Sequence, residues 1–261
     1  PGPAVCPPPR SIEPEWAYAV ACADGVRLFS LAGETVRELS SRCIVRSLSA
    51  FGSWVAAAGM EGCVELWDVV DPRHASANGG ARPYGTLNGY CGSDGYSLSW
   101  RSDGGGLAVS GKRAAIFDFT ASNPPHPYRP KNTTPARVGQ PDTVPRICMN
   151  ASNGAHLVAW APCHGPESIE CSDSISSKLA TVDNEGVVRL WQPHRLPLRK
   201  GGNGNPAQPE RMKPQFYTFP TQDGMHPSGD AVKACALMWL QEDVFAVAYV
   251  TGDIVAWRPG S

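Results

Sequence analysis

Five cysteine and histidine residues lie close together in the middle of the chain, and their side chains are of the types that bind zinc. They are Cys148, His156, Cys163, His164 and Cys171. Zinc-binding loops usually bring their ligands in closely spaced pairs, with two to five residues between them. The spacing here does not follow that pattern. We therefore predict no metal site and no cofactor, and we expect buried or loop cysteines with incidental histidines.

Residues for covalent or acid–base catalysis are not arranged in a recognisable pattern. Ser93 and Ser102 each begin a Ser-Asp-Gly turn, and the chain has no G-x-S-x-G elbow that would present a nucleophilic serine. The histidines fall mostly in loops, beside Pro, Arg or Gly, at His74, His126, His156, His164, His194 and His226. We predict that the protein is not an enzyme and has no catalytic residues.

A basic segment is the most distinctive charged feature. Its residues are Arg195, Arg199, Lys200, Arg211 and Lys213, with Glu210 as the only acid among them. Such a cluster is suited to nucleic-acid phosphates or to an acidic partner. No aromatic side chains that would stack on bases lie between the charges. Three interpretations stay open: a solvated loop, a partner-binding loop, and a nucleic-acid contact.

The overall composition narrows the class of protein. The 23 basic and 24 acidic residues nearly cancel, which excludes a globally basic nucleic-acid binder and a strongly acidic tail protein. The 27 glycines and 25 prolines predict many turns and several long loops. Nine cysteines without a C-x-x-C pair favour free thiols in a reducing compartment, so we expect an intracellular protein, cytoplasmic or nuclear. No apolar run approaches the ~20 residues that span a membrane, and we expect no membrane contact.

One short pattern repeats five times and defines the elements that carry these residues. Each copy has a β-branched or small residue, any residue, an aliphatic residue and an aromatic residue, and the copies end at Phe29, Trp67, Phe117, Trp191 and Trp257. A tight-turn signal precedes each copy, and another apolar run, such as WVAAAG at 54–59, precedes the turn. Two β-rich runs around such a turn predict a hairpin.

A second set of apolar segments lies upstream of four of the five hairpins. These segments are 47–50, 97–100, 157–160 and 236–239, and the last three end in Trp100, Trp160 and Trp239. The first hairpin has no such segment before it. Weaker strand candidates follow some hairpins, at 35–39, 146–149 and 216–219. The repeating unit is therefore predicted to be a four-stranded antiparallel sheet.

This unit resembles the WD repeat. The segment VELWD at 64–68, with the dipeptide Trp67-Asp68, is the fullest match, and VDNEGVVRLW at 182–191 is nearly as good. The resemblance covers residues 16–258 and implies an all-β propeller, whose small sheets bury their apolar faces by stacking as blades. The Gly-His dipeptide of the family is absent, and four units replace Trp-Asp. The family's Asp–His–Ser/Trp hydrogen-bond network is therefore not assigned to named residues.

The spacing of the repeats indicates insertions and an unusual blade number. Successive closing aromatics are separated by 38, 50, 74 and 66 residues, against ~40–45 for a bare unit. We predict a Pro-rich segment at 1–15, a propeller at 16–258, and insertions near 121–145 and 193–214. Five blades are recognisable, whereas most WD-type rings have seven. The chain is part of a seven-bladed ring, or builds degenerate blades from its ends, or is completed by a partner. A β-sandwich explains many strands but not five copies of one hairpin.

The resemblance implies a non-catalytic scaffold or adaptor subunit of a multiprotein complex. Such a subunit binds other proteins through propeller faces and loops, and the long insertions fit this role. The alternative is a propeller subunit of a nucleic-acid-associated complex, in transcription, chromatin or RNA processing, that uses the basic loop at 195–213.

Overall fold

A computed structural model describes residues 16–59, 63–69, 80–81, 83, 85–87, 97–102, 104, 106–111, 114–118, 147–149, 155–162, 178–191, 210–212, 227–228, 230–241 and 243–258. Within these ranges every regular element is a β-strand, and the strands form five separate sheets. The predicted all-β class is therefore confirmed.

Apart from β7 and β16, each of the five sheets is built from strands that are consecutive along the chain or nearly so. The first contains β1 (Tyr18–Cys22), β2 (Gly25–Phe29), β3 (Thr35–Ser40) and β7 (Gly80–Ala81), and the second contains β4 (Val45–Phe51), β5 (Trp54–Gly59), β6 (Val64–Asp68) and β8 (Gly85–Leu87). The third contains β9 (Leu98–Trp100), β10 (Gly106–Val109), β11 (Ala114–Asp118), β12 (Ile147–Met149) and β16 (Glu210–Met212). The fourth contains β13 (Leu157–Trp160), β14 (Leu179–Val182) and β15 (Val188–Trp191), and the fifth contains β17 (Ala234–Gln241), β18 (Val244–Tyr249) and β19 (Ile254–Trp257).

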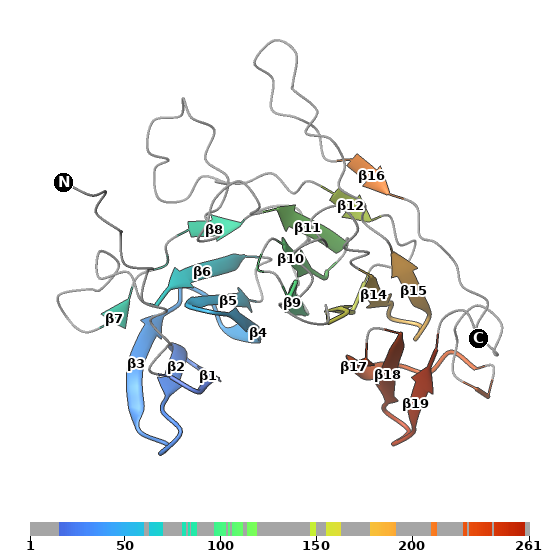
Figure 1. Ribbon diagram of the computed structural model, residues 1–261, viewed down its shortest axis with the longest axis horizontal. Helices are drawn as coiled ribbons and strands as arrows, with labels where there is room; N and C mark the ends of the chain where they lie inside the picture. Colours follow the sequence, from blue (N-terminus) through green and yellow to red (C-terminus); the bar gives the residue numbers. More distant parts are fainter. Residues whose placement is uncertain are drawn as a thin grey trace, which may run out of the picture.

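The sheets are arranged along an arc that is open between β1 and the fifth sheet (Figure 1). The first strands of successive sheets contact one another on its concave side, β1 with β4, β4 with β9, β9 with β13 and β13 with β17. Small antiparallel sheets stacked around a common axis are the blades of a β-propeller. The predicted propeller architecture is confirmed.

The predicted four strands per blade occur in two of the five sheets. Among the described residues the third sheet has five strands, and the fourth and fifth have three each. The additional strands β7 and β16 pair in parallel with β3 and β12 at the outer edges. These edge strands have two or three residues, which is too short for an alternating sequence pattern to mark them. The segment 216–219, a candidate fourth strand, lies outside the described residues.

The two strands of each predicted hairpin pair antiparallel. In the fourth sheet, Gly186 has a φ of 81°, in the left-handed region that favours glycine. A Cβ atom at this position would lie 2.1 Å from the backbone oxygen of Val232, so glycine also permits the fifth sheet to approach. The turn therefore reverses the chain and allows the next blade to pack closely.

The hydrophobic core lies between successive sheets, in four separate clusters, one for each interface. The closing aromatic of each blade after the first is buried in the cluster that faces the preceding blade: Trp67 against the first sheet, Phe117 against the second, Trp191 against the third and Trp257 against the fourth. Each cluster joins strands distant in sequence, so the interfaces hold the arc together.

Candidate protein-interaction site

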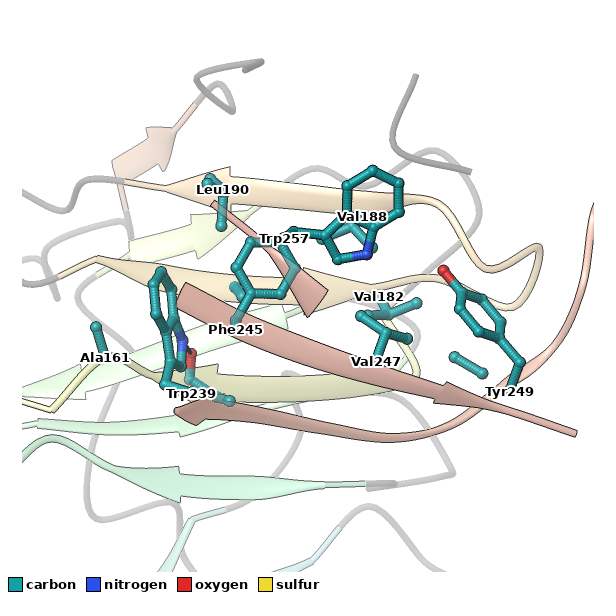
Figure 2. Close-up of a cluster of buried hydrophobic side chains, with 12 residues drawn as sticks. Ala161, Val182, Val188, Leu190, Trp239, Phe245, Val247, Tyr249 and Trp257 are labelled. Carbon is teal, nitrogen blue, oxygen red and sulfur yellow. Dashed lines mark hydrogen bonds between the residues drawn. The ribbon is translucent and has the colours of Figure 1, made fainter. Parts of the chain in front are cut away.

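Each described interface between blades buries the closing aromatic of the later sheet against the earlier sheet. Figure 2 shows the last interface, where Trp239, Phe245 and Trp257 of the fifth sheet pack onto the fourth. The fourth sheet contributes small and branched aliphatic side chains, among them Val182 and Leu190. The Trp239 ring nitrogen also donates to the carbonyl oxygen of Ala159 at 2.9 Å, so this buried ring keeps its polar atom satisfied.

The inner-strand tryptophans take equivalent places at three interfaces. Trp100 packs against the second sheet, Trp160 against the third and Trp239 against the fourth. The Arg101 guanidinium also lies over the Trp160 ring, 5.9 Å from its centroid. The second sheet has Ala50 at the corresponding position, facing the first sheet. The interface between the first two sheets therefore lacks the tryptophan that the others share.

Serine hydroxyls join the inner strands from blade to blade. In β4, the hydroxyl oxygens of Ser47 and Ser49 accept hydrogen bonds from the backbone of β9, at Leu98 N (3.2 Å) and Trp100 N (3.1 Å). The same arrangement recurs one blade later, because Ser97 and Ser99 of β9 accept from the backbone of β13, at Val158 N (3.4 Å) and Trp160 N (3.0 Å). Inner-edge amides that no neighbouring strand pairs are thus satisfied by side chains. We call these four contacts the serine seam.

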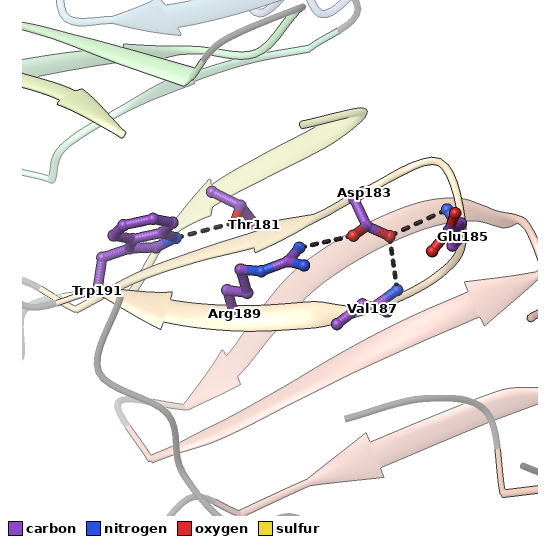
Figure 3. Close-up of polar contacts among 6 residues, drawn as sticks. All are labelled: Thr181, Asp183, Glu185, Val187, Arg189 and Trp191. Atoms are coloured by element: carbon purple, nitrogen blue, oxygen red, sulfur yellow. Dashed lines mark hydrogen bonds and ion pairs between the residues drawn. The ribbon is translucent and has the colours of Figure 1, made fainter. Parts of the chain in front are cut away.

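The fourth sheet contains a buried polar network that the sequence resemblance left unassigned. Asp183 accepts from the backbone amides of Glu185 and Val187, both at 2.9 Å, and from the Arg189 guanidinium at 2.6 Å (Figure 3). The Trp191 ring nitrogen donates to the Thr181 hydroxyl at 2.8 Å. The Asp183 side chain is fully buried, so the arginine supplies the charge that its burial requires. This network fixes the hairpin turn and has no free group for chemistry.

A second buried carboxylate lies between the first and second sheets. Glu65 is fully buried, and both of its oxygens accept from the backbone amide of Arg42 at 3.3 Å. Burial, followed by the nearby Cys43 and Glu65, raises the pKa of the Cys63 thiol to about 12. A thiol with so high a pKa is protonated at neutral pH and is a poor nucleophile and metal ligand.

His156 is placed at the entrance to β13, beside the fourth sheet's inner strand. Its backbone amide donates to Val182 O at 2.7 Å, and its carbonyl accepts from the Ser110 hydroxyl at 3.0 Å. Burial, and then the positive charge of Lys233, lowers the pKa of the imidazole. The neutral ring is therefore favoured in the folded protein.

The first and fifth sheets expose apolar side chains on faces that the inner sheets bury against a neighbouring sheet. On the first sheet, Tyr18 stacks on Phe29 with ring centroids 5.2 Å apart, yet Tyr18 is 44% exposed. On the fifth sheet, Met238 and Ile254 point to the side away from the fourth sheet and are 57% and 75% exposed. Exposed apolar side chains that gather on one face are typical of protein-binding surfaces. These two open faces are the candidate interaction site.

The other predicted site residues are placed as follows. Trp67 and Asp68 lie in β6, and Arg211 lies in β16, at the outer edge of the third sheet. The remaining basic-loop residues, Arg195, Arg199, Lys200 and Lys213, lie outside the described residues, as do both insertions except β16. Of the Cys/His group only His156 has a described side chain, and in the described part of the chain no three metal-binding side chains come together. Among the described residues, Cys22, Cys63 and Cys235 carry free thiols.

The comparisons with known proteins add one structural similarity. No protein-family model matches the chain, and no curated protein matches its sequence. Among 918 matching chains of solved structures is the β-propeller domain of Cps50 (Swd1) from Myceliophteria thermophila, with a TM-score of 0.49 and 13% sequence identity. The match covers 83% of this chain and 54% of that chain, so the present chain spans about half of its length. Among the described residues, no helix has the length and apolar character needed to cross a bilayer.

Proposed function

We propose that this protein is a non-catalytic scaffold subunit that binds other proteins through its end sheets and loops. The observation that carries this proposal is the exposure of apolar side chains on the two open faces. Burying a large apolar side chain is worth about 1.5–3 kcal/mol. Covering both faces with partner proteins would therefore stabilise a complex substantially.

The use of the buried polar groups supports a non-catalytic role. Within the described residues, the hydrogen bonds of Glu65, Thr181 and Asp183 go to neighbouring backbone or side-chain groups of the blades. Ser110 likewise donates to the His156 carbonyl. A catalytic group needs a polar atom directed at a substrate. The buried groups here stabilise turns and strands instead.

Isolation of native complexes tests the proposal, followed by reconstitution of each complex from its purified components. We expect a defined assembly that is weakened by Tyr18→Asp or Met238→Asp, because each substitution puts a charge on an open face. Leu31→Asp is the matched control, since Leu31 is 93% exposed in a turn outside both faces. A protein found only as a free monomer, or one whose turnover of a substrate is lost with a single loop substitution, would contradict the scaffold role.

The alternative role in a nucleic-acid-associated complex rests on the basic segment. Strand β16 pairs with β12, which attaches this segment to the outer edge of the third sheet. Replacing the basic side chains at 195, 199, 200, 211 and 213 by glutamine should weaken DNA or RNA binding and reduce its salt dependence, since each phosphate contact releases counterions. An unchanged affinity and salt slope would remove this alternative.

A further inference from the structure

Two cysteine side chains meet on the face of the second sheet that packs against the first sheet. Gly59 and Cys63 lie opposite each other across the β5–β6 hairpin, where the Gly59 amide donates to the carbonyl oxygen of Cys63 at 3.0 Å. Opposite residues of an antiparallel pair project to the same face. The Cys63 side chain therefore lies on the face of residue 59, which is also the face of Val55 and Ala57 in the interface core.

The Cys43 side chain occupies the place of the side chain that Gly59 lacks. A Cβ atom at residue 59 would lie 2.1 Å from the Cys43 sulfur and 2.7 Å from the Cys43 Cβ. The Cys43 side chain is also hydrogen-bonded to the Cys63 thiol. The two sulfur atoms are thus beside each other, because glycine at residue 59 leaves the space that the Cys43 sulfur fills.

Hydrogen bonds hold Cys43 in this position, within the connection from β3 of the first sheet to β4 of the second. The Ser41 hydroxyl donates to the carbonyl oxygen of Cys43 at 2.8 Å and accepts from the Cys43 amide at 3.2 Å. The next contact is that of the Arg42 amide with the buried Glu65 carboxylate, at 3.3 Å. Glu65 follows Cys63 by two residues on the same face, so neighbouring contacts attach this connection to one strand of the second sheet.

We propose that Cys43 and Cys63 are a reversible dithiol–disulfide site, whose disulfide forms by exchange with a low-molecular-weight disulfide such as oxidised glutathione. The bond joins the connection between the first two sheets to the residue that precedes β6. This is the interface that lacks the tryptophan shared by the others. Oxidation therefore fixes the connection covalently to the second blade, and reduction leaves it held by hydrogen bonds and packing alone. The inference does not depend on the proposed scaffold role.

The exchange begins at Cys43, because the Cys63 thiol is held protonated. Burial, followed by the nearby Cys43 and Glu65, raises the pKa of Cys63 to about 12, and only a thiolate attacks a disulfide. The Cys43 thiolate breaks the glutathione disulfide, forms a mixed disulfide and releases one glutathione thiolate. The Cys63 thiol then gives its proton to solvent, attacks the Cys43 sulfur and releases the second glutathione thiolate. Two protein thiols are thereby oxidised to one disulfide, and one glutathione disulfide is reduced to two thiols.

The mixed disulfide favours the second step in two ways. It removes the negative charge of the Cys43 thiolate, which is one of the causes that raise the pKa of Cys63. It also places the sulfur that is attacked beside the attacking thiol, so the step is intramolecular and needs no diffusional encounter. A thiol that reacts slowly with an external reagent can therefore still close the disulfide.

Peptide mapping of the full chain tests the site. The reduced protein is incubated with oxidised glutathione under native conditions, its remaining thiols are alkylated, and it is digested with trypsin. Trypsin separates Cys43, in the peptide 43–46, from Cys63, in the peptide 47–73. We expect these two peptides to be joined in most molecules and to separate on reduction with dithiothreitol. Exposed Cys235 should instead carry glutathione, which verifies that the oxidant has acted.

Matched variants locate the bond. Cys63→Ser removes the resolving thiol and should leave Cys43 as its mixed disulfide with glutathione. Cys22→Ser alters a partly exposed thiol of β1 and should leave the Cys43–Cys63 linkage unchanged. Gly59→Ala puts a Cβ atom into the space of the Cys43 sulfur and should slow the linkage by about tenfold or more. Circular dichroism of each reduced variant verifies that the fold is retained.

Thermal unfolding measures what the bond does to the fold. A disulfide that closes a loop of about twenty residues should raise the Tm of the oxidised chain by about 6–12 °C over that of the reduced chain. Cys63→Ser, treated with the same oxidant, should change its Tm by less than about 2 °C. The difference between the two proteins isolates the effect of the bond from that of glutathione on other cysteines.

Three results would overturn the proposal. The first is that Cys43 and Cys63 are alkylated separately while Cys235 carries glutathione. The second is that either cysteine joins a different cysteine as the main product, or that the two join as fast in urea as in the native protein. The third is an oxidised chain whose Tm equals that of the reduced chain. None of these results bears on the scaffold role, which isolation of the native complex tests separately.

Discussion

Removal of one seam hydroxyl should destabilise the protein although the side chain is small and partly exposed. The Ser99→Ala substitution deletes the oxygen that accepts from Trp160 N at 3.0 Å. Trp160 is buried at the interface between the third and fourth sheets, so water cannot readily replace the lost acceptor. Leaving a buried amide without a partner costs about 1–3 kcal/mol.

Urea unfolding followed by tryptophan fluorescence measures this loss. With a denaturant slope of about 3 kcal/mol/M, the midpoint should fall by about 0.3–1 M. Hydrogen exchange at the Trp160 amide should become about 5- to 150-fold faster, because each 1.4 kcal/mol corresponds to a factor of ten.

Two controls separate the hydroxyl from its surroundings. Ser99→Thr keeps the acceptor and should retain most of the stability. Ser40→Ala alters an exposed serine in β3 that is not one of the four serines of the seam, and it should change the stability by less than about 0.5 kcal/mol. If Ser99→Ala matches Ser40→Ala in midpoint and in Trp160 exchange, the seam has no energetic role and the reasoning is refuted.

Three further perturbations have defined outcomes. Gly186→Ala should lower the free energy of unfolding by more than about 2 kcal/mol, because its Cβ would lie 2.1 Å from the backbone oxygen of Val232. Gly52→Ala, with φ 54° and open space around it, should lower it by only about 1 kcal/mol. Equal losses of stability in thermal unfolding would contradict the close approach at Gly186. At pH 8, the rate at which Cys63 reacts with iodoacetamide should be at least about 30-fold lower than that of exposed Cys235, because a pKa of about 12 leaves little thiolate. Comparable rates for the two cysteines in peptide mapping would contradict the burial of Cys63. Because the pKa of His156 is lowered, the folded protein binds a proton at this imidazole less readily than the unfolded chain does. The stability present above pH 6.5 should therefore decline as the pH falls below 6.5, and His156→Gln should reduce this decline. The same pH dependence of stability in His156→Gln and in the original protein would exclude the effect.

The hairpins were predictable because their signals are local. A glycine turn between two apolar runs and a closing aromatic such as Trp191 lie within about a dozen residues, and the same pattern recurs four more times. The tryptophans of the inner strands were also visible as a repeating column. By contrast, β7, β8 and β16 are short edge strands whose pairing depends on how loops return to a sheet. Their sequences show no alternation of apolar and polar residues that would identify them as strands.

The site was harder to predict because it depends on contacts between blades. Ser97 and Ser99 look like the polar positions of a half-buried strand, and only the stacking of sheets reveals that their hydroxyls serve the next blade. The partnership of Asp183 with Arg189 had one local signal, an aspartate before a Glu-Gly turn with an arginine three residues after the glycine. The open faces depend on which sheets have a neighbouring sheet packed against them, and no single segment of the sequence encodes that arrangement.

Hydrogen exchange of the protein alone and in its reconstituted native complex tests the central claim most directly. If the arc of blades is a scaffold that binds through its open end sheets, exchange should slow on complex formation in β1 and in β17–β19. The interior strands β5, β10 and β14, already covered by neighbouring blades, should keep their rates. Unchanged exchange at both end sheets in a complex that forms would contradict the account.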